Sequence, residues 1–341
     1  MSVSNLNPRT IGVINYRHMG DVLCSFPALL ALRTRWPAAK IVVLAGPLGC
    51  ALLPGSGLSD VMVPISRDRH GFWNGLRALR REQPDLVICL QNSQRLRWLA
   101  RFSGARHRIG FAGGKFDNFL TQTVEKVGPP WIFDDLRLVE ALGCPPVKND
   151  IAGLLRLSDN ERAEATRFLE AAGVDKGERL IGVNLGASDE RRVWPLEDFA
   201  RVINALQEQP RARAVLLGGP EDRPRIEALQ RLLKREAVQC AGELSPRVTA
   251  AILERCAVLV TNDSGPMHLA IAVETPVVGL FGPVAASHRL PPGYGHIGLE
   301  HNAPCRAVRQ FGCVDEHTCP ECACLRAITP DEVVAAARSR L

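Results

Sequence analysis

The sequence lacks the features that mark membrane-spanning, secreted and nucleic-acid-binding proteins. It contains no run of about eighteen uninterrupted apolar residues, so we expect no membrane span. Its first ten residues are polar and lack the apolar core of a secretion signal. The formal net charge is +6, without concentrated lysine and arginine tracts. That mild basicity fits an anionic ligand or an acidic membrane face better than a nucleic acid. We therefore expect a cytoplasmic protein that does not bind nucleic acid.

Two common nucleotide-binding motifs are also absent. The glycine turns "LGASDE" and "LGGPED" lack the third glycine of GxGxxG at its proper offset. No acidic residue closes the second expected strand, so a nicotinamide dehydrogenase is disfavoured. The absence of GxxxxGK[ST] disfavours a P-loop ATPase. There is no low-complexity segment and no short-period repeat.

The cysteines fall into two groups. Six of the eleven are scattered through apolar segments and indicate reduced core residues, namely Cys24, Cys50, Cys89, Cys144, Cys240 and Cys256. The other five cluster near the end of the chain around His317, namely Cys305, Cys313, Cys319, Cys322 and Cys324. C-x2-C is a metal-ligand spacing, although zinc sites usually bring two such pairs. A structural zinc or iron site at Cys305, Cys313, Cys319 and Cys322 therefore stays open beside reduced thiols or a disulfide.

What the sequence does contain is a repeated alternation of strands and helices. The 341 residues suggest two domains. Apolar strand-like runs alternate with amphipathic helical patterns, as in doubly wound parallel sheets. In the first unit we expect strands at 11–15, 40–46, 60–65, 85–91 and 107–113, with helices at 21–36, 72–82 and 96–105. In the second we expect strands at 179–186, 212–219, 257–262 and 275–282, with helices at 196–209, 221–235 and 265–273.

The segment 134–173 is mostly helical in pattern and would connect the two units. Two such units in tandem would leave a cleft between them. Ligands of wound sheets sit beyond the carboxyl ends of the strands, so the loops after strands are candidate sites.

Three loops of the second unit are candidate ligand-binding loops. In "TNDSGPMHL" a helix opens at Pro266, and the turn of Asp263, Ser264 and Gly265 offers free amides and a helix dipole to a phosphate. In "LGASDERRVWP" Arg192 could neutralise a diphosphate. In "LLGGPED" Glu221 would suit ribose hydroxyls. Each loop also has a purely structural explanation. The first could be a capped turn, the second a solvated loop and the third a simple helix cap.

Asp21 raises the same question in the first unit. It follows Gly20 and directly precedes a long apolar run. It either caps a helix or presents a carboxylate to the cleft as a base.

Four motifs stand in one order across the chain: "HMGDVLCSFPALLALR", "LGASDERRVWP", "LLGGPED" and "TNDSGPMHLAIAVETPVVGLFGP". This combination resembles the ADP-heptose:lipopolysaccharide heptosyltransferase family, glycosyltransferase family 9. The resemblance implies a GT-B fold, with two Rossmann-like domains that face each other across a cleft. It implies an N-terminal acceptor domain with the helical connector at 1–172 and a nucleotide-sugar domain at 173–328. The last helix, at 329–341, would pack back toward the N-terminal domain.

The resemblance also implies the chemistry. Heptose would pass from ADP-heptose to a lipopolysaccharide inner-core acceptor with inversion and without a metal or other required cofactor. Asp21 maps onto the family's general base. The donor site would comprise Ser188, Arg192, Glu221, Asp263, Ser264, Gly265 and His268. An anionic acceptor could meet Arg17, His18, Arg106, His107 and Arg108, and the lipid-borne acceptor implies peripheral contact with the inner membrane.

Two other readings stay open at this point. The chain could be a family 9 enzyme that uses another nucleotide sugar or acceptor, or a non-catalytic nucleotide-sugar-binding protein that has kept the fold. The sequence fixes neither the donor sugar, nor the acceptor hydroxyl, nor the oligomeric state.

Overall fold

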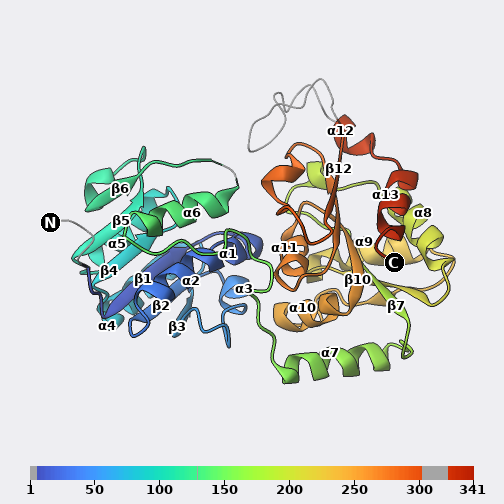
Figure 1. Ribbon diagram of the computed structural model, residues 1–341, viewed down its shortest axis with the longest axis horizontal. Helices are drawn as coiled ribbons and strands as arrows, with labels where there is room; N and C mark the ends of the chain where they lie inside the picture. The colour runs from blue at the N-terminus through green and yellow to red at the C-terminus, as the bar shows by residue number, and fades with distance from the viewer. Residues whose placement is uncertain (1–5, 129, 302–321) are drawn as a thin grey trace. The chain divides into compact units, whose positions relative to one another are not determined.

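The computed structural model describes residues 6–128, 130–301 and 322–341. The chain divides into two compact units, Met1–Leu154 and Leu155–Leu341, each built around a six-stranded parallel sheet. Figure 1 shows each sheet with helices packed along it. The predicted α/β class with two doubly wound domains is confirmed.

The sheet of the first unit has the strand order β3-β2-β1-β4-β5-β6, the order of dinucleotide-binding domains. Its strands are β1 (Thr10–Asn15), β2 (Lys40–Ala45), β3 (Val61–Pro64), β4 (Leu86–Cys89), β5 (His107–Phe111) and β6 (Gln122–Val124). Its helices are α1 (Met19–Cys24), α2 (Phe26–Arg35), α3 (Pro47–Cys50), α4 (Arg69–Glu82), α5 (Gln94–Phe102) and α6 (Trp131–Glu140), with a 3-10 turn η2 (Asp117–Phe119).

The sheet of the second unit repeats this order as β9-β8-β7-β10-β11-β12. Its strands are β7 (Arg179–Asn184), β8 (Ala212–Leu217), β9 (Val238–Gln239), β10 (Cys256–Asn262), β11 (Val277–Phe281) and β12 (Ile297–Glu300). Its helices are α7 (Asp159–Ala171), α8 (Leu196–Gln207), α9 (Arg223–Gln230), α10 (Pro246–Glu254), α11 (Gly265–Ala272), α12 (Ala323–Arg326) and α13 (Pro330–Arg338), with 3-10 turns η3 (Glu190–Arg192), η4 (Pro220–Asp222) and η5 (Ala286–His288).

The first strand of each unit contains a glycine. A Cβ on Gly12 of β1 would lie 3.0 Å from Leu79 of α4, the crossover helix that leads into β4. Gly12 therefore lets α4 pack closely on the centre of its sheet. A Cβ on Gly182 of β7 would first meet Leu259 of the neighbouring strand β10, at 3.1 Å.

A proline and a glycine explain two differences from the expected helices. The helix expected at 21–36 is interrupted at Ser25, because Pro27 has no N–H to continue the α1 ladder into α2. In the segment expected to be mostly helical, α6 ends at Glu140 in a turn where Gly143 has a φ of 76°, and non-helical chain separates it from α7. Helix α10 and the short strands β6, β9 and β12 were not anticipated.

The expected connector is divided between the units, with α6 in the first and α7 in the second, and the last helix belongs to the second unit. The division between units lies at Leu154, earlier than the boundary expected at residue 172. Helix α7 packs on α10, where Glu161 pairs with Arg247. Helix α13 packs on α8 and buries Val333 and Ala337 in the second unit's core, while its expected approach to the N-terminal domain stays a prediction. None of the helices in the described part of the chain is long and apolar enough to cross a membrane.

Candidate active site

The centre of the second sheet is a topological switch point. Strands β7 and β10 are neighbours there, with Asn184 opposite Thr261 at their carboxyl ends, and the chain crosses to opposite sides after each. Loops that follow such a pair diverge and leave a crevice, which is where open α/β sheets bind ligands. The loops with "LGASDERRVWP" and "NDSGP" follow these two strands.

Two buried asparagines tie these loops together. The Asn184 amide donates to Ser264 Oγ at 2.9 Å and to the Gly186 carbonyl at 2.9 Å. Asn262 accepts from the Trp194 backbone N–H at 3.1 Å and donates to the Leu185 carbonyl at 2.8 Å. Because both asparagines are at most 1% exposed, these bonds fix the two loops in one arrangement.

Two arginines lie beside Asp263, which directly follows β10. Its carboxylate lies 3.3 Å from Arg192 Nη1 and 3.2 Å from Arg289 Nε, and its side chain is 6% exposed. Two guanidinium groups around one carboxylate leave a net positive charge. Arg289 follows η5 and was missed in the sequence, where nothing marks it apart from other arginines. The neighbouring Arg191 is held by Asp189 at 2.7 Å, so Arg192 is the arginine of this loop that faces Asp263.

The start of α11 is suited to an anion. Ser264 is its N-cap and makes no side-chain cap bond to the helix, while Ser264, Gly265 and Pro266 are partly exposed. Unsatisfied amides and the positive end of the dipole therefore meet solvent beside the Asp263 arginines. His268, one turn further along α11, is buried at 7% exposure.

The glycine turn after β8 contains two carboxylates, Asp222 and Glu221, whose surroundings differ. Asp222 accepts from the Gly219 N–H at 2.9 Å, and burial raises the pKa of Asp222. A Cβ on Gly186 would lie 2.3 Å from Asp222, so that glycine lets the β7 loop approach the turn. Glu221 is exposed, and within the described residues it has no hydrogen-bond or ion-pair partner. Ser188, also exposed, lies in the adjoining β7 loop.

Asp21 lies at the corresponding switch point of the first sheet, after β1. It is in the first turn of α1, which His18 begins as N-cap without a side-chain bond. The carboxylate is partly buried and, among residues 6–128, 130–301 and 322–341, makes no hydrogen bond or ion pair. Asp21 therefore does not cap its own helix, although its charge suits the helix dipole.

The loop before Asp21 is held rigidly. Arg17 pairs with Asp135 of α6 through two bonds of 2.7 and 3.0 Å and also donates to the Leu90 carbonyl. The Tyr16 N–H donates to Gln91 Oε1 at 3.0 Å. Burial raises the pKa of Asp135 to about 6, against the opposing pull of Arg17. These bonds join the loops after β1 and β4, which meet at the switch point.

The residues expected to receive the acceptor are not all together. His18 is exposed beside Arg67, whose Nη2 lies 3.4 Å from His18 Nε2. Arg17 is not an exposed cation, because Asp135 holds it at 9% side-chain exposure. Arg106, His107 and Arg108 are at the amino end of β5, where Arg108 pairs with Val87 near the start of β4. That edge of a parallel sheet is opposite to the one from which Asp21 emerges.

Only part of the C-terminal cysteine cluster lies within the described residues. Cys305, Cys313 and Cys319 lie outside the described residues, and Cys322 is the buried N-cap of α12. No group of three metal-ligating side chains occurs within the described ranges. Burial raises the pKa of the Cys89, Cys144 and Cys256 thiols to about 12, which is the behaviour of protonated core residues.

Comparisons with known proteins agree with this architecture. Residues 73–313 match the family model described as glycosyltransferase family 9 (heptosyltransferase). Lipooligosaccharide heptosyltransferase 2 of Haemophilus influenzae is 27% identical over 296 residues, which are 82% of this chain and 85% of that protein.

Solved structures of similar proteins identify the fold as GT-B. The glycosyl transferase family 9 structure from Veillonella parvula superposes with a TM-score of 0.82 at 24% identity, covering 100% of this chain and 98% of that one. The ADP-heptose LPS heptosyltransferase II of E. coli gives 0.79 at 22% identity, covering 97% and 98%. Because the family model spans well over half of the sequence, the assignment follows directly: this chain is a glycosyltransferase and belongs to glycosyltransferase family 9.

Proposed function

We propose that this enzyme transfers a heptose from ADP-heptose to a lipopolysaccharide inner-core acceptor, with inversion at the anomeric carbon and without a catalytic metal. Family membership supports sugar transfer. The relative from H. influenzae is a lipooligosaccharide heptosyltransferase, and the similar E. coli structure is an ADP-heptose LPS heptosyltransferase. These names support the donor and the acceptor.

The donor would bind at the switch point of the second sheet. Its diphosphate would meet the amides at the start of α11 and the cations of Arg192 and Arg289. Asp263 would keep the two guanidinium groups in position before the donor arrives. Ser188, Ser264 and His268 are the other candidate contacts of this loop cluster. Glu221 is the candidate for the ribose hydroxyls, because it is exposed while Asp222 is used by the turn. Preorganised cations and amides stabilise the charge that grows on the leaving ADP.

The transfer would be a single displacement. Asp21 takes the proton from the acceptor hydroxyl, whose oxygen forms a bond to the anomeric carbon. The bond from that carbon to the β-phosphate oxygen breaks, and ADP leaves with the electron pair. Attack from the face opposite the leaving group inverts the anomeric configuration.

The observation that carries this proposal is the state of Asp21. The Asp21 carboxylate is partly exposed at the start of α1, near the Arg17 charge, and within the described chain it makes no hydrogen bond or ion pair that would occupy its oxygens. It stands at the carboxyl end of the central strand β1, on a loop fixed by the Arg17–Asp135 pair. Its position and its availability both suit a general base.

The proposal is tested by measuring transfer from nucleotide sugars. With ADP-heptose and a Kdo-containing acceptor, we expect ADP release and a product one heptose heavier, and turnover should persist in excess EDTA. Nuclear magnetic resonance should give a product linkage of opposite anomeric configuration to the donor. UDP- and GDP-linked sugars should neither react nor raise the melting temperature as ADP-heptose does. Preference for a UDP or GDP donor would overturn the donor assignment.

A further inference from the structure

A cluster of aromatic side chains lies at the surface of the first unit, on α5 and the loop that follows β5. Trp98 on α5 stacks on Phe102 with ring centroids 5.3 Å apart, and meets Phe116 and Phe119 edge-on at 5.4 and 5.0 Å. We call these four residues the aromatic platform. Trp98, Phe102 and Phe116 are 36%, 39% and 38% exposed. Contiguous exposed rings of this kind mark an interaction surface more often than isolated apolar residues do.

The platform is built on a rigid support. Arg97, at 2% exposure, donates to Asn92 Oδ1 at 2.6 Å, to the Phe111 carbonyl at 2.8 Å and to Asp117 Oδ1 at 2.6 Å. Asp117 in turn accepts from the Gly113 N–H at 3.0 Å. These bonds anchor the loop that presents Phe116 and Phe119.

Phe116 is held in an unfavourable backbone conformation. Its φ of 68° lies in the left-handed region, which is strained for a bulky residue. Glycine would adopt this conformation without strain. The chain therefore keeps an exposed ring at a position where the backbone favours glycine, as expected if the ring has a use at the surface.

Cations surround the platform. Arg101 is exposed one turn after Trp98, and Lys115 is exposed directly before Phe116. Arg80 Nε donates to the Phe102 carbonyl at 3.0 Å, and Arg108 Nε donates to the Phe119 carbonyl at 2.7 Å. Burial, together with the nearby Arg101 charge, lowers the pKa of Arg108. The acidic residue of this loop, Asp117, is already paired with Arg97.

The first unit as a whole also carries a net positive charge. Residues 1–154 contain 19 Lys and Arg against 11 Asp and Glu, whereas residues 155–341 contain 23 against 25. The basic character of the chain therefore belongs entirely to the unit that carries the platform. A positive surface of this kind attracts an anionic partner over a Debye length.

We propose that the aromatic platform and its surrounding cations dock the enzyme on a bilayer that contains anionic lipid. Tryptophan and phenylalanine insert at the boundary of headgroups and acyl chains, while arginine and lysine meet the phosphates. Four cations lie around the rings, while the acidic residue of the loop is paired with Arg97, and such a single-sign surface complements the negative phosphates of a bilayer. The choice of a bilayer rests on the proposed function, because the acceptor is carried by a lipid.

Vesicle flotation tests this surface directly. The full-length protein is mixed with vesicles of phosphatidylcholine alone or of equal parts phosphatidylcholine and phosphatidylglycerol. The wild type should float with the anionic vesicles only, and less at high salt. The double variant Trp98→Ala/Arg101→Glu should lower the apparent partition coefficient by about tenfold or more. The matched control Arg231→Glu/Leu232→Ala alters an exposed arginine and an exposed leucine of the second unit and should bind as the wild type does.

A second variant tests whether weaker vesicle binding could come from misfolding. Phe116→Gly removes an exposed ring at a backbone position that glycine accepts, so it should stay folded and still bind less. Unchanged binding by both platform variants, or a wild type that ignores anionic vesicles, would refute the docking surface. Loss of self-association in the platform variants, seen by gel filtration without any vesicle binding, would assign the surface to a second copy instead.

A parallel assay separates this proposal from the proposed function. Turnover of ADP-heptose on a delipidated acceptor should be unchanged in the platform variants. Vesicle binding without any turnover in the wild type would reject the transfer reaction and leave the docking surface standing.

Discussion

At the residue scale, the ion pair between Arg17 and the buried Asp135 fixes the loop that precedes Asp21. Arg17 and Arg108 are both basic and both looked suited to an anionic acceptor. In the structure Arg17 forms a buried ion pair with Asp135, and Arg108 lies at the amino edge of the sheet. Neither outcome is visible in the sequence, because Asp135 is more than a hundred positions from Arg17 and strand direction decides the edge. Asp21, Arg192 and Asp263 could be selected because each directly follows a strand and has a motif around it.

The Arg17–Asp135 pair yields a prediction for stability. Asp135→Asn removes the negative charge beside a guanidinium that is 9% exposed, and breaking such a pair costs about 3–5 kcal/mol. Urea unfolding at neutral pH should show this loss of unfolding free energy. The exposed Lys234–Glu208 pair offers the control, and Glu208→Gln should leave the midpoint unchanged. An Asp135→Asn protein as stable as the wild type would mean that the pair does not anchor the Asp21 loop.

Secondary-structure elements were predictable where apolar periodicity was strong. The central strands of both sheets are buried on both faces and read as continuous apolar runs, so their positions followed from composition. The strands β6, β9 and β12 are short and lie at or near sheet edges, where little side-chain burial is available to mark them. Helix α10 has local signals that could have identified it, with Ser245 as N-cap and Pro246 at the first helical position, whereas its packing on α7 could not be foreseen, because the ion pair that joins them spans 86 positions.

That same ion pair predicts how acid affects α7. Glu161 caps the helix with Ser158 and pairs with Arg247 of α10. Although burial acts in the opposite direction, the hydrogen bonds from Arg247 and Ser158 lower the pKa of Glu161 to about 2. The unfolded chain releases this proton near the ordinary value of 4.5, so the stabilisation is present above that pH and is lost as the pH falls toward 2.

Unfolding measured across that pH range checks the sign. Glu161→Gln should be less stable than the wild type at neutral pH, and the gap between the two should narrow steadily as the pH falls from 5 toward 2. A gap that stays constant with pH would show that the charge of Glu161 does not contribute.

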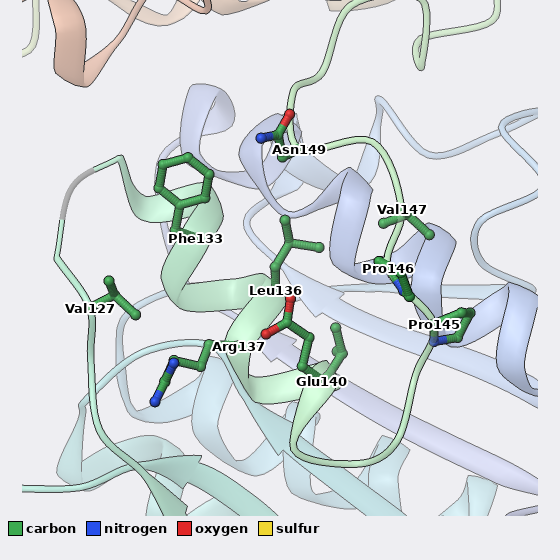
Figure 2. Close-up of a pocket in the computed structure, with 10 residues that line it drawn as sticks. Val127, Phe133, Leu136, Arg137, Glu140, Pro145, Pro146, Val147 and Asn149 are labelled. Atoms are coloured by element: carbon green, nitrogen blue, oxygen red, sulfur yellow. The ribbon is translucent and has the colours of Figure 1, made fainter.

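A second surface feature of the first unit has no assigned role. The groove between α6 and residues 145–149 has a volume of about 300 Å³ and is lined by Phe133, Leu136 and Pro146 (Figure 2). Arg137 and Glu140 of α6 also line this groove. Nothing in the structure indicates what would cover it, and the proposals above do not use it.

At the scale of the whole molecule, two units of the same topology carry different chemistry. Each has a switch point at its central strand pair, one with an available carboxylate and the other with cations and helix amides. The basic charge is confined to the first unit, which also holds the aromatic platform. The sequence motifs identified the fold and the loops, because strand–loop–helix patterns are local. The aromatic platform escaped notice, since Trp98 and Phe116 come from different elements.

The most direct test of the account is the effect of Asp21→Asn on turnover and on ADP binding, measured in the same preparation. Loss of a general base should lower kcat by about 10²–10⁴-fold while the Kd for ADP, measured by calorimetry, stays within about twofold of the wild type. The control Asp159→Asn, in the first turn of α7, should change neither quantity. Wild-type turnover in Asp21→Asn, or a parallel loss of ADP affinity, would contradict the assignment of Asp21 as the base.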